Sequence, residues 1–167
     1  MSYLTLADAA SGAAFSECRR YRYRLWRTWD AAKPAIAFCM LNPSTADDVK
    51  NDPTVERCER RAREWGYGRL FVVNLFAWRS TDPKGMLAAA DPVGPDNFDA
   101  IVDALRDSRM FICAWGAHGK WMGMGDLLLR RLAESYPGRA YALKINRDGT
   151  PAHPLYLPYT LKPEPIK

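Results

Sequence analysis

Residues 36–41, IAFCML, form an uninterrupted apolar run that ends directly in a polar turn at residues 42–45, NPST. A short apolar run closed by turn-forming residues is typical of a strand buried on both faces. The same pattern occurs three more times, with a different polar signature after each run: residues 70–73 before Asn74-Leu75, residues 110–114 before Trp115-Gly116, and residues 140–143 before a loop that contains His153-Pro154. Strands of this kind belong to parallel sheets, which bind ligands at their carboxyl edge. We therefore expect the four signatures at one edge of one sheet.

Helical segments are expected between these strands, at residues 54–65, near 97–107 and within 119–135. Asp52 is the expected N-cap of the first helix, with Pro53 at its first helical position. The alternation of strands and helices predicts an α/β fold, a three-layer α/β/α sandwich around a central, mainly parallel sheet of four strands.

The length of 167 residues predicts a single domain. We expect an N-terminal strand or hairpin arm within residues 1–33, a core over residues 34–158, and a proline-rich tail over residues 159–167 that frays. The contents of 48% hydrophobic and 26% charged residues are those of a globular protein and argue against extensive disorder.

Cysteine placement and hydropathy indicate the cellular setting. The four cysteines, at positions 18, 39, 58 and 113, include no C-x-x-C pair, which predicts reduced thiols and neither a metal site nor a cofactor. No apolar stretch has the length of a membrane span and the N-terminus has no signal-peptide pattern, so we expect a cytoplasmic protein without a membrane partner. The sequence does not indicate an oligomeric state.

The formal net charge is +5, and the arginines gather in two segments. They stand at positions 19, 20, 22, 24 and 27, and again at 57, 60, 61 and 63. Arginine interleaved with aromatic residues can hold phosphates and stack bases, which predicts phosphate contacts by Arg22 and Arg24 and a nucleic-acid or nucleotide partner. The alternating pattern fits equally well a half-buried edge strand whose arginines are only solvated.

The order of the four signatures resembles the uracil-DNA glycosylase superfamily. In that superfamily the first strand ends in Gly-x-Asp/Asn-Pro, the second in an asparagine, the third in a Leu-Trp-Gly-like turn and the last in His-Pro-Ser. The matching places in this chain hold Asn42-Pro43, Asn74, Trp115-Gly116 and His153-Pro154. The resemblance implies a glycosylase-like topology over the core and a pocket that binds a nucleobase.

A closer resemblance is to a bacterial and phage family known as domain of unknown function 1643. It rests on five segments of the chain: LNPSTAD at 41–47, NDPT at 51–54, WGYG at 65–68, NLFA at 74–77 and HPLYL at 153–157. This resemblance covers nearly the whole chain and implies no activity.

The glycosylase resemblance implies Asn42 and His153 as catalytic residues. Asn42 would orient the attacking water, because an amide cannot take a proton as a general base. His153 would donate a hydrogen bond to the departing base. Asn74 would read the base edge, since a carboxamide offers both a donor and an acceptor. Further substrate contacts are implied at Pro43, Ser44, Trp115, Gly116, Leu155 and Tyr156, the last two as a wedge into the base stack.

Two more groups of residues remain open to different interpretations. His118 and Lys120 lie near an expected helix start, where backbone amides attract phosphate, and are predicted phosphate contacts. Asp47, Asp48 and Asp52 could serve a magnesium-dependent phosphoryl hydrolase, although solvated loop acids and an N-cap account for them too.

The leading hypothesis is recognition of a nucleobase, nucleoside or nucleotide, with N-glycosidic hydrolysis on DNA or RNA as the reaction. The alternative is a nucleic-acid or nucleotide binding module without turnover.

Overall fold

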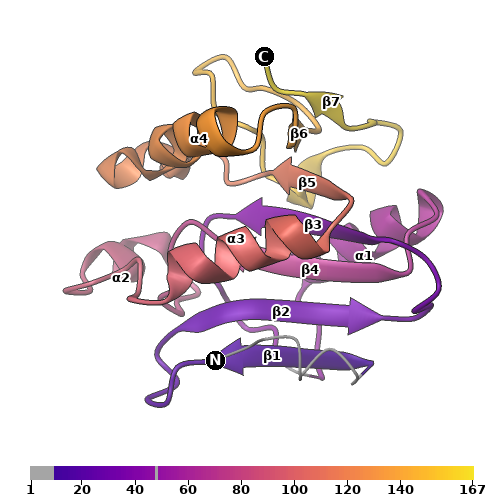
Figure 1. Cartoon of the computed structure of the whole chain (residues 1–167). Coiled ribbons are helices and arrows are strands. Elements are labelled where there is room, and N and C mark those ends of the chain that lie inside the picture. Colours follow the sequence, from indigo (N-terminus) through magenta and orange to yellow (C-terminus); the bar gives the residue numbers. More distant parts are fainter. Residues whose placement is uncertain (1–9, 48) are drawn as a thin grey trace.

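The computed structural model describes residues 10–47 and 49–167, which form a mixed α/β fold around one seven-stranded sheet (Figure 1). The strands follow the spatial order β1-β2-β4-β3-β5-β6-β7. Their bounds are β1 Ser11–Phe15, β2 Arg22–Thr28, β3 Ala35–Met40, β4 Arg69–Asn74, β5 Met110–Cys113, β6 Ala140–Ala142 and β7 Glu164–Pro165. The sheet is therefore larger than the four strands predicted from the apolar runs.

The four strands expected from those runs lie together in the middle of the sheet. β3 pairs in parallel with β4 on one side and with β5 on the other, and β5 pairs in parallel with β6. Phe38 stands opposite Val72 on β4 and Ile112 on β5, and all three are fully buried. The parallel pairing places the carboxyl ends of these strands at one edge.

The additional strands pair antiparallel at the two sides of this parallel group. β1 and β2 form a hairpin, and β2 pairs with β4. The arginine-rich strand β2 thus lies between two neighbours, so the alternative interpretation as a half-buried edge strand is wrong. On the other side β7 pairs with β6, and Ile166 N donates to Ala140 O at 2.9 Å. The tail is paired rather than frayed, because proline is tolerated on an edge strand.

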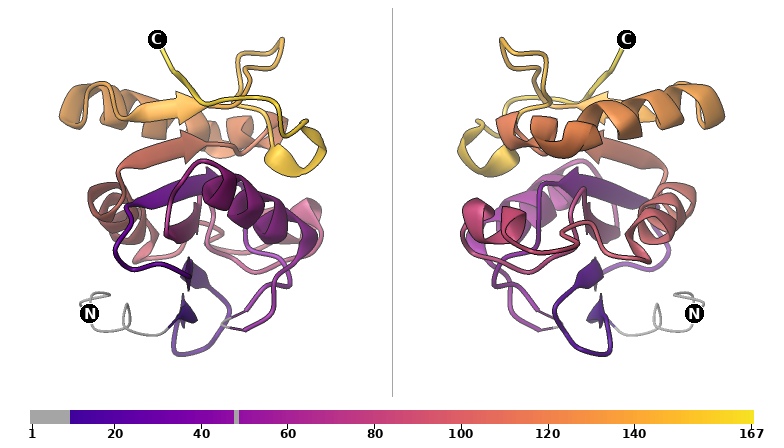
Figure 2. Two further views of the ribbon diagram at one scale, coloured as in Figure 1. Left: turned by 90° about the vertical axis from the view of Figure 1, so that its right-hand side faces the viewer. Right: turned by 90° about the vertical axis from the view of Figure 1, so that its left-hand side faces the viewer.

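The helices cover both faces of the sheet. Their bounds are α1 Pro53–Glu64, α2 Pro83–Leu87, α3 Asn97–Asp107 and α4 Met124–Ser135, with 3-10 helices η2 at Ala117–Gly123 and η3 at Pro154–Tyr156. In Figure 1, α3 and α4 lie in front of the sheet and α1 lies behind it, and Figure 2 shows the same arrangement from the two sides.

Two clusters of buried side chains correspond to these two faces. Val55 and Cys58 of α1 pack with Phe38 on one face, whereas Leu105 of α3 and Leu128 of α4 pack in the other cluster. Alternate residues of each central strand point to opposite clusters, which accounts for the unbroken apolar runs in the sequence.

The predictions for the start of the first helix and for the cysteines are confirmed. Asp52 is the N-cap of α1, with Val55 N donating to its Oδ1 at 2.8 Å, and Pro53 is the first helical residue. The four cysteines are free, and burial raises the pKa of the Cys58 thiol to about 12. Within residues 10–47 and 49–167, no helix combines the length and apolar character needed to cross a membrane.

Candidate functional site

The first polar signature of the carboxyl edge is Asn42, two residues after the end of β3. Its Nδ2 donates to Ser80 O at 2.8 Å and to Pro43 O at 3.1 Å. Ser80 N donates back to Pro43 O at 3.0 Å, so the turn is tied to the segment after β4. Both amide hydrogens are used, whereas Oδ1 accepts no hydrogen bond from a described residue. The side chain is half-buried, so Oδ1 can accept a hydrogen bond from a ligand or from water.

Asn74, the last residue of β4, is the most unusual side chain of the site. It is 1% exposed, and neither its Nδ2 nor its Oδ1 has a hydrogen-bond partner among the described residues. By strand alternation it lies on the same face as Leu70 and Val72, which pack in the cluster beneath α1. A buried amide without partners is costly, so Asn74 is a candidate contact for a polar ligand.

The backbone beside that amide is held firmly from the other face of the sheet. Asn97, the first residue of α3, is fully buried, and its Nδ2 donates to Asn74 O at 2.9 Å and to Leu75 O at 3.0 Å. Asn97 is not among the residues predicted from the sequence. Its only signal is an asparagine at the start of an amphipathic helix, which by itself predicts capping.

His153 precedes η3 at the end of the fourth signature. Its Nδ1 accepts a hydrogen bond from Leu155 N at 3.3 Å. Burial lowers the pKa of His153 below its ordinary value, and the nearby Asp52 carboxylate opposes this shift in part. The imidazole is therefore neutral near pH 7, and because Nδ1 is the acceptor its proton stands on Nε2. The site thus contains a neutral hydrogen-bond donor.

The turn after β5 packs against the loop that carries His153. Gly116 has φ +75° and ψ −172°, and its N donates to Pro151 O at 2.8 Å. A Cβ at Gly116 would lie 3.5 Å from His153 Cβ. Trp115, in contrast, is 2% exposed and packs in the cluster that faces α4. The structure therefore brings Gly116 to His153 but places Trp115 on the face opposite that of Asn74.

Helix α1 holds the loop after His153 in place. Arg57 Nη2 and Arg61 Nη2 donate to Leu157 O at 2.5 Å and 2.7 Å, and Arg57 Nε donates to Pro154 O at 3.4 Å. Figure 2 shows η3 beside α1. These contacts fix the middle of α1 against the loop that follows His153.

The two arginines predicted to contact phosphate are buried and contact different elements. Arg22 is 2% exposed, and its Nη1 donates to Ala46 O at 2.7 Å. Burial lowers the pKa of Arg22 to about 10. Arg24 is 5% exposed, pairs with Asp107 of α3 at 2.9 Å and stacks on Phe71.

Arg27 resembles Arg22 in its role, since its Nη2 donates to Asp47 O at 2.7 Å. Two arginines of β2 therefore hold the loop that follows Asn42. Arg22 and Arg24 do not form a shared surface that could bind phosphate groups, because tertiary contacts bury both guanidinium groups.

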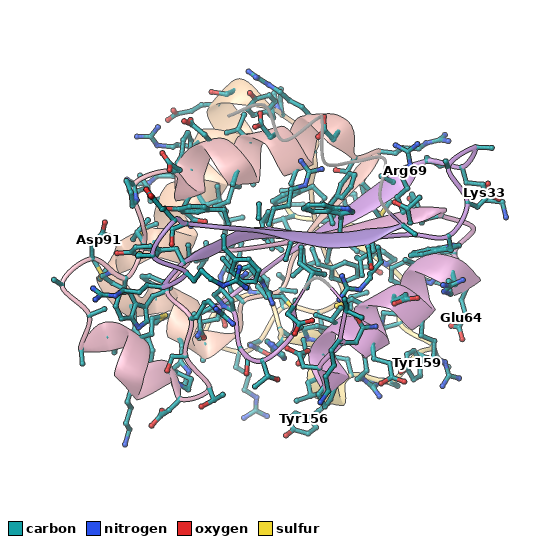
Figure 3. The ribbon with its side chains drawn as sticks, turned by 90° about the horizontal axis from the view of Figure 1, so that it is seen from below. Lys33, Glu64, Arg69, Asp91, Tyr156 and Tyr159 are labelled. Atoms are coloured by element: carbon teal, nitrogen blue, oxygen red, sulfur yellow. The ribbon has the colours of Figure 1, made fainter. Side chains whose placement is uncertain are left out.

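The other predicted contact residues are more exposed. His118 stacks on Trp121 with ring centroids 4.2 Å apart, and Lys120 Nζ lies 3.7 Å from Asp148 Oδ2. Tyr156 is 91% exposed and projects away from the ribbon (Figure 3). The remaining residues implied by the resemblance are Pro43, which is buried, and Ser44 and Leu155, which are half-buried.

The two predicted carboxylates that the structure describes, Asp47 and Asp52, accept hydrogen bonds from backbone amides of their own loop or helix. Asp47 Oδ1 accepts from Val49 N and Lys50 N, at 2.9 Å and 2.7 Å, and Asp52 caps α1. Asp48 lies outside the described residues. Across the part of the chain that the structure describes, no cluster of three or more histidine, cysteine or acidic residues has a geometry that could hold a metal ion.

The structure is a mixed α/β fold whose parallel strands are followed by polar side chains, among them the buried Asn74 and the half-buried Asn42 and His153. Residues 22–155 match the family described as "Protein of unknown function (DUF1643)". Because the match covers well over half of the chain, the protein belongs to this family. No curated protein and no solved structure matches the chain.

Proposed function

We propose that the protein recognises a nucleobase at the carboxyl edge of its parallel strands and hydrolyses the N-glycosidic bond of the bound nucleotide unit. The observation that carries the proposal is the Asn74 carboxamide, which is 1% exposed and has no partner among the described residues. An amide presents an adjacent donor and acceptor, which match the carbonyl and N–H of a uracil-like base edge.

The neighbouring groups suit the departure of a base. The neutral His153 imidazole donates from Nε2, because its Nδ1 is occupied by Leu155 N. A donor at this place stabilises the negative charge that develops on the base as its glycosidic bond breaks. Asn42 Oδ1 can orient a water molecule, since its Nδ2 is fixed by two carbonyl oxygens.

The test is the release of free base, measured by mass spectrometry, from single-stranded and duplex oligonucleotides that contain uracil or hypoxanthine. We expect His153→Ala to lower turnover about a hundredfold with little change in substrate affinity, because the contact strengthens in the transition state. Asn42→Asp is expected to raise the rate by supplying a carboxylate to the water. The absence of released base from every oligonucleotide would refute the proposed reaction.

A second candidate is a nucleic-acid or nucleotide binding module without turnover. The observation that favours it is that residue 42 is an amide, which cannot accept the proton of an attacking water. This candidate predicts tight binding of the same oligonucleotides without product, and an equal loss of affinity in Asn74→Leu, His153→Ala and Asn42→Ala.

A further inference from the structure

Hydrolysis at this site needs a proton acceptor, and neither residue implied as catalytic can be one. Asn42 is an amide, and both hydrogens of its Nδ2 are bound to carbonyl oxygens. His153 already uses Nδ1 to accept from Leu155 N, and its other nitrogen carries the proton. A group that takes a proton from water must therefore come from another element.

Asp52 is a described carboxylate that the topology places at this edge of the sheet, at the start of α1. It stands at the N-terminus of α1, which begins after the loop from Asn42 and so starts at the carboxyl edge of β3. One turn further along α1, Arg57 donates to Pro154 O, the residue directly after His153. Arg22 reaches the same loop from β2 through Ala46 O. Three elements therefore converge around the Asp52 end of the helix.

The capping bond leaves half of this carboxylate available. Val55 N donates to Asp52 Oδ1 at 2.8 Å, whereas no described residue donates to Oδ2. A carboxylate fixed by one oxygen and open at the other is suited to accept a hydrogen bond from water. The unpartnered and buried amide of Asn74 at the same edge of the sheet is an independent observation that favours a polar ligand at this edge.

We infer that Asp52 is the general base of the proposed reaction. The inference rests on the proposed function. Water held between Asn42 Oδ1 and Asp52 Oδ2 attacks the anomeric carbon. A C–O bond forms, the C–N bond breaks, and its electron pair leaves on the base, where His153 donates a hydrogen bond. The proton of the water passes to Asp52 and then to the released base, so that charge and atoms balance.

The electrostatics of the described residues agree with this placement. The Asp52 carboxylate raises the pKa of His153 and of Arg22, against the larger lowering that burial causes in both. The charged and titratable groups that face Asp52 in this way are His153 before η3, Arg22 on β2 and Cys58 on α1.

The experiment compares Asp52→Asn with Asp30→Asn in the same base-release assay. Asparagine caps helices about as well as aspartate, so Asp52→Asn removes the carboxylate and keeps the helix start. Asp30 is a matched control, because its Oδ1 accepts from Ala32 N in a turn at the opposite edge of the sheet. We expect Asp52→Asn to lower kcat by about a hundredfold or more, with KM nearly unchanged and the thermal unfolding midpoint preserved, and Asp30→Asn to behave as wild type.

A second readout does not depend on activity. The chain has two histidines, so His153 can be followed by NMR with His118 as an internal reference. Removing the Asp52 carboxylate removes a charge that favours the imidazolium, and Asp52→Asn should therefore lower the measured pKa of His153.

The outcomes separate the two proposals. If wild-type protein releases base and Asp52→Asn does so at an undiminished rate, or if the pKa of His153 does not change, the role of Asp52 is overturned and the reaction stands. If wild-type protein releases no base, the proposed function fails and the role of Asp52 fails with it.

Discussion

Replacing Asn74 with leucine should stabilise the protein and abolish its ligand recognition. The side chain is 1% exposed, and no described residue pairs with its Nδ2 or Oδ1. Leaving a buried polar group unpaired costs about 1–3 kcal/mol. Leucine has a similar length and branching, and an imperfect fit of such a substitution costs less than about 1.5 kcal/mol. The free energy of unfolding of the ligand-free protein is thus expected to rise by about 1 kcal/mol.

The matched control is Asn97→Leu, which alters the second buried asparagine of the same region. Asn97 is also fully buried and its Oδ1 has no partner among the described residues, but its Nδ2 donates two hydrogen bonds, to Asn74 O and Leu75 O. Its replacement leaves two buried carbonyl groups without these donors and should lower the free energy of unfolding by about 1–3 kcal/mol. The two substitutions are chemically identical, so opposite signs would reflect the two hydrogen bonds that Asn97 Nδ2 donates and Asn74 Nδ2 does not.

The assay is urea denaturation of the two variants and the wild type, compared by their midpoints at an unchanged slope. Binding of a uracil-containing oligonucleotide is measured on the same samples. We expect Asn74→Leu to unfold at higher urea concentration and to lose binding. Residues that serve function often lower stability, so their replacement can stabilise a protein while it abolishes activity. A loss of stability in Asn74→Leu as large as in Asn97→Leu would show that the Asn74 amide is satisfied within the protein, and the assignment of the site would be refuted.

Three further predictions concern the surroundings of the site. Gly116→Ala should lower the free energy of unfolding by about 1–3 kcal/mol in thermal unfolding, because φ +75° with ψ −172° is a region that essentially only glycine occupies. Since burial lowers the pKa of His153, the unfolded chain binds a proton more readily. Stability should therefore fall as the pH drops below the ordinary histidine value of about 6.5, and His153→Gln should reduce this loss in urea titrations between about pH 7.5 and about pH 5.5. Asp107→Ala, which removes the carboxylate 2.9 Å from the buried Arg24, should cost about 1–3 kcal/mol, and the double variant with Arg24→Met should recover part of it in chemical denaturation.

The sequence by itself determined the parallel strands and the start of the first helix. The run at residues 36–41 is apolar at every position because β3 lies between β4 and β5 and is covered by helices on both faces. Asp52 and Pro53 specify a helix start through local backbone chemistry, which needs no knowledge of the remaining chain. Because parallel strands end at one edge, the order of the polar signatures also predicted where Asn42 and Asn74 lie.

The tertiary structure alone decided what each polar residue contacts. Alternating arginines on a strand give the same pattern whether they face solvent or a buried loop, and only the pairing of β2 between β1 and β4 shows that Arg22 and Arg24 are buried. Trp115 follows an apolar run just as Asn74 does, yet it packs on the opposite face.

The approach of α1 to the loop after His153 depends on hydrogen bonds between residues about a hundred positions apart, such as the one from Arg57 to Leu157 O. A sequence pattern records local periodicity, whereas burial and partnership arise from contacts between distant segments. The unpartnered amide of Asn74, on which the functional argument depends, could therefore be seen only in the folded chain.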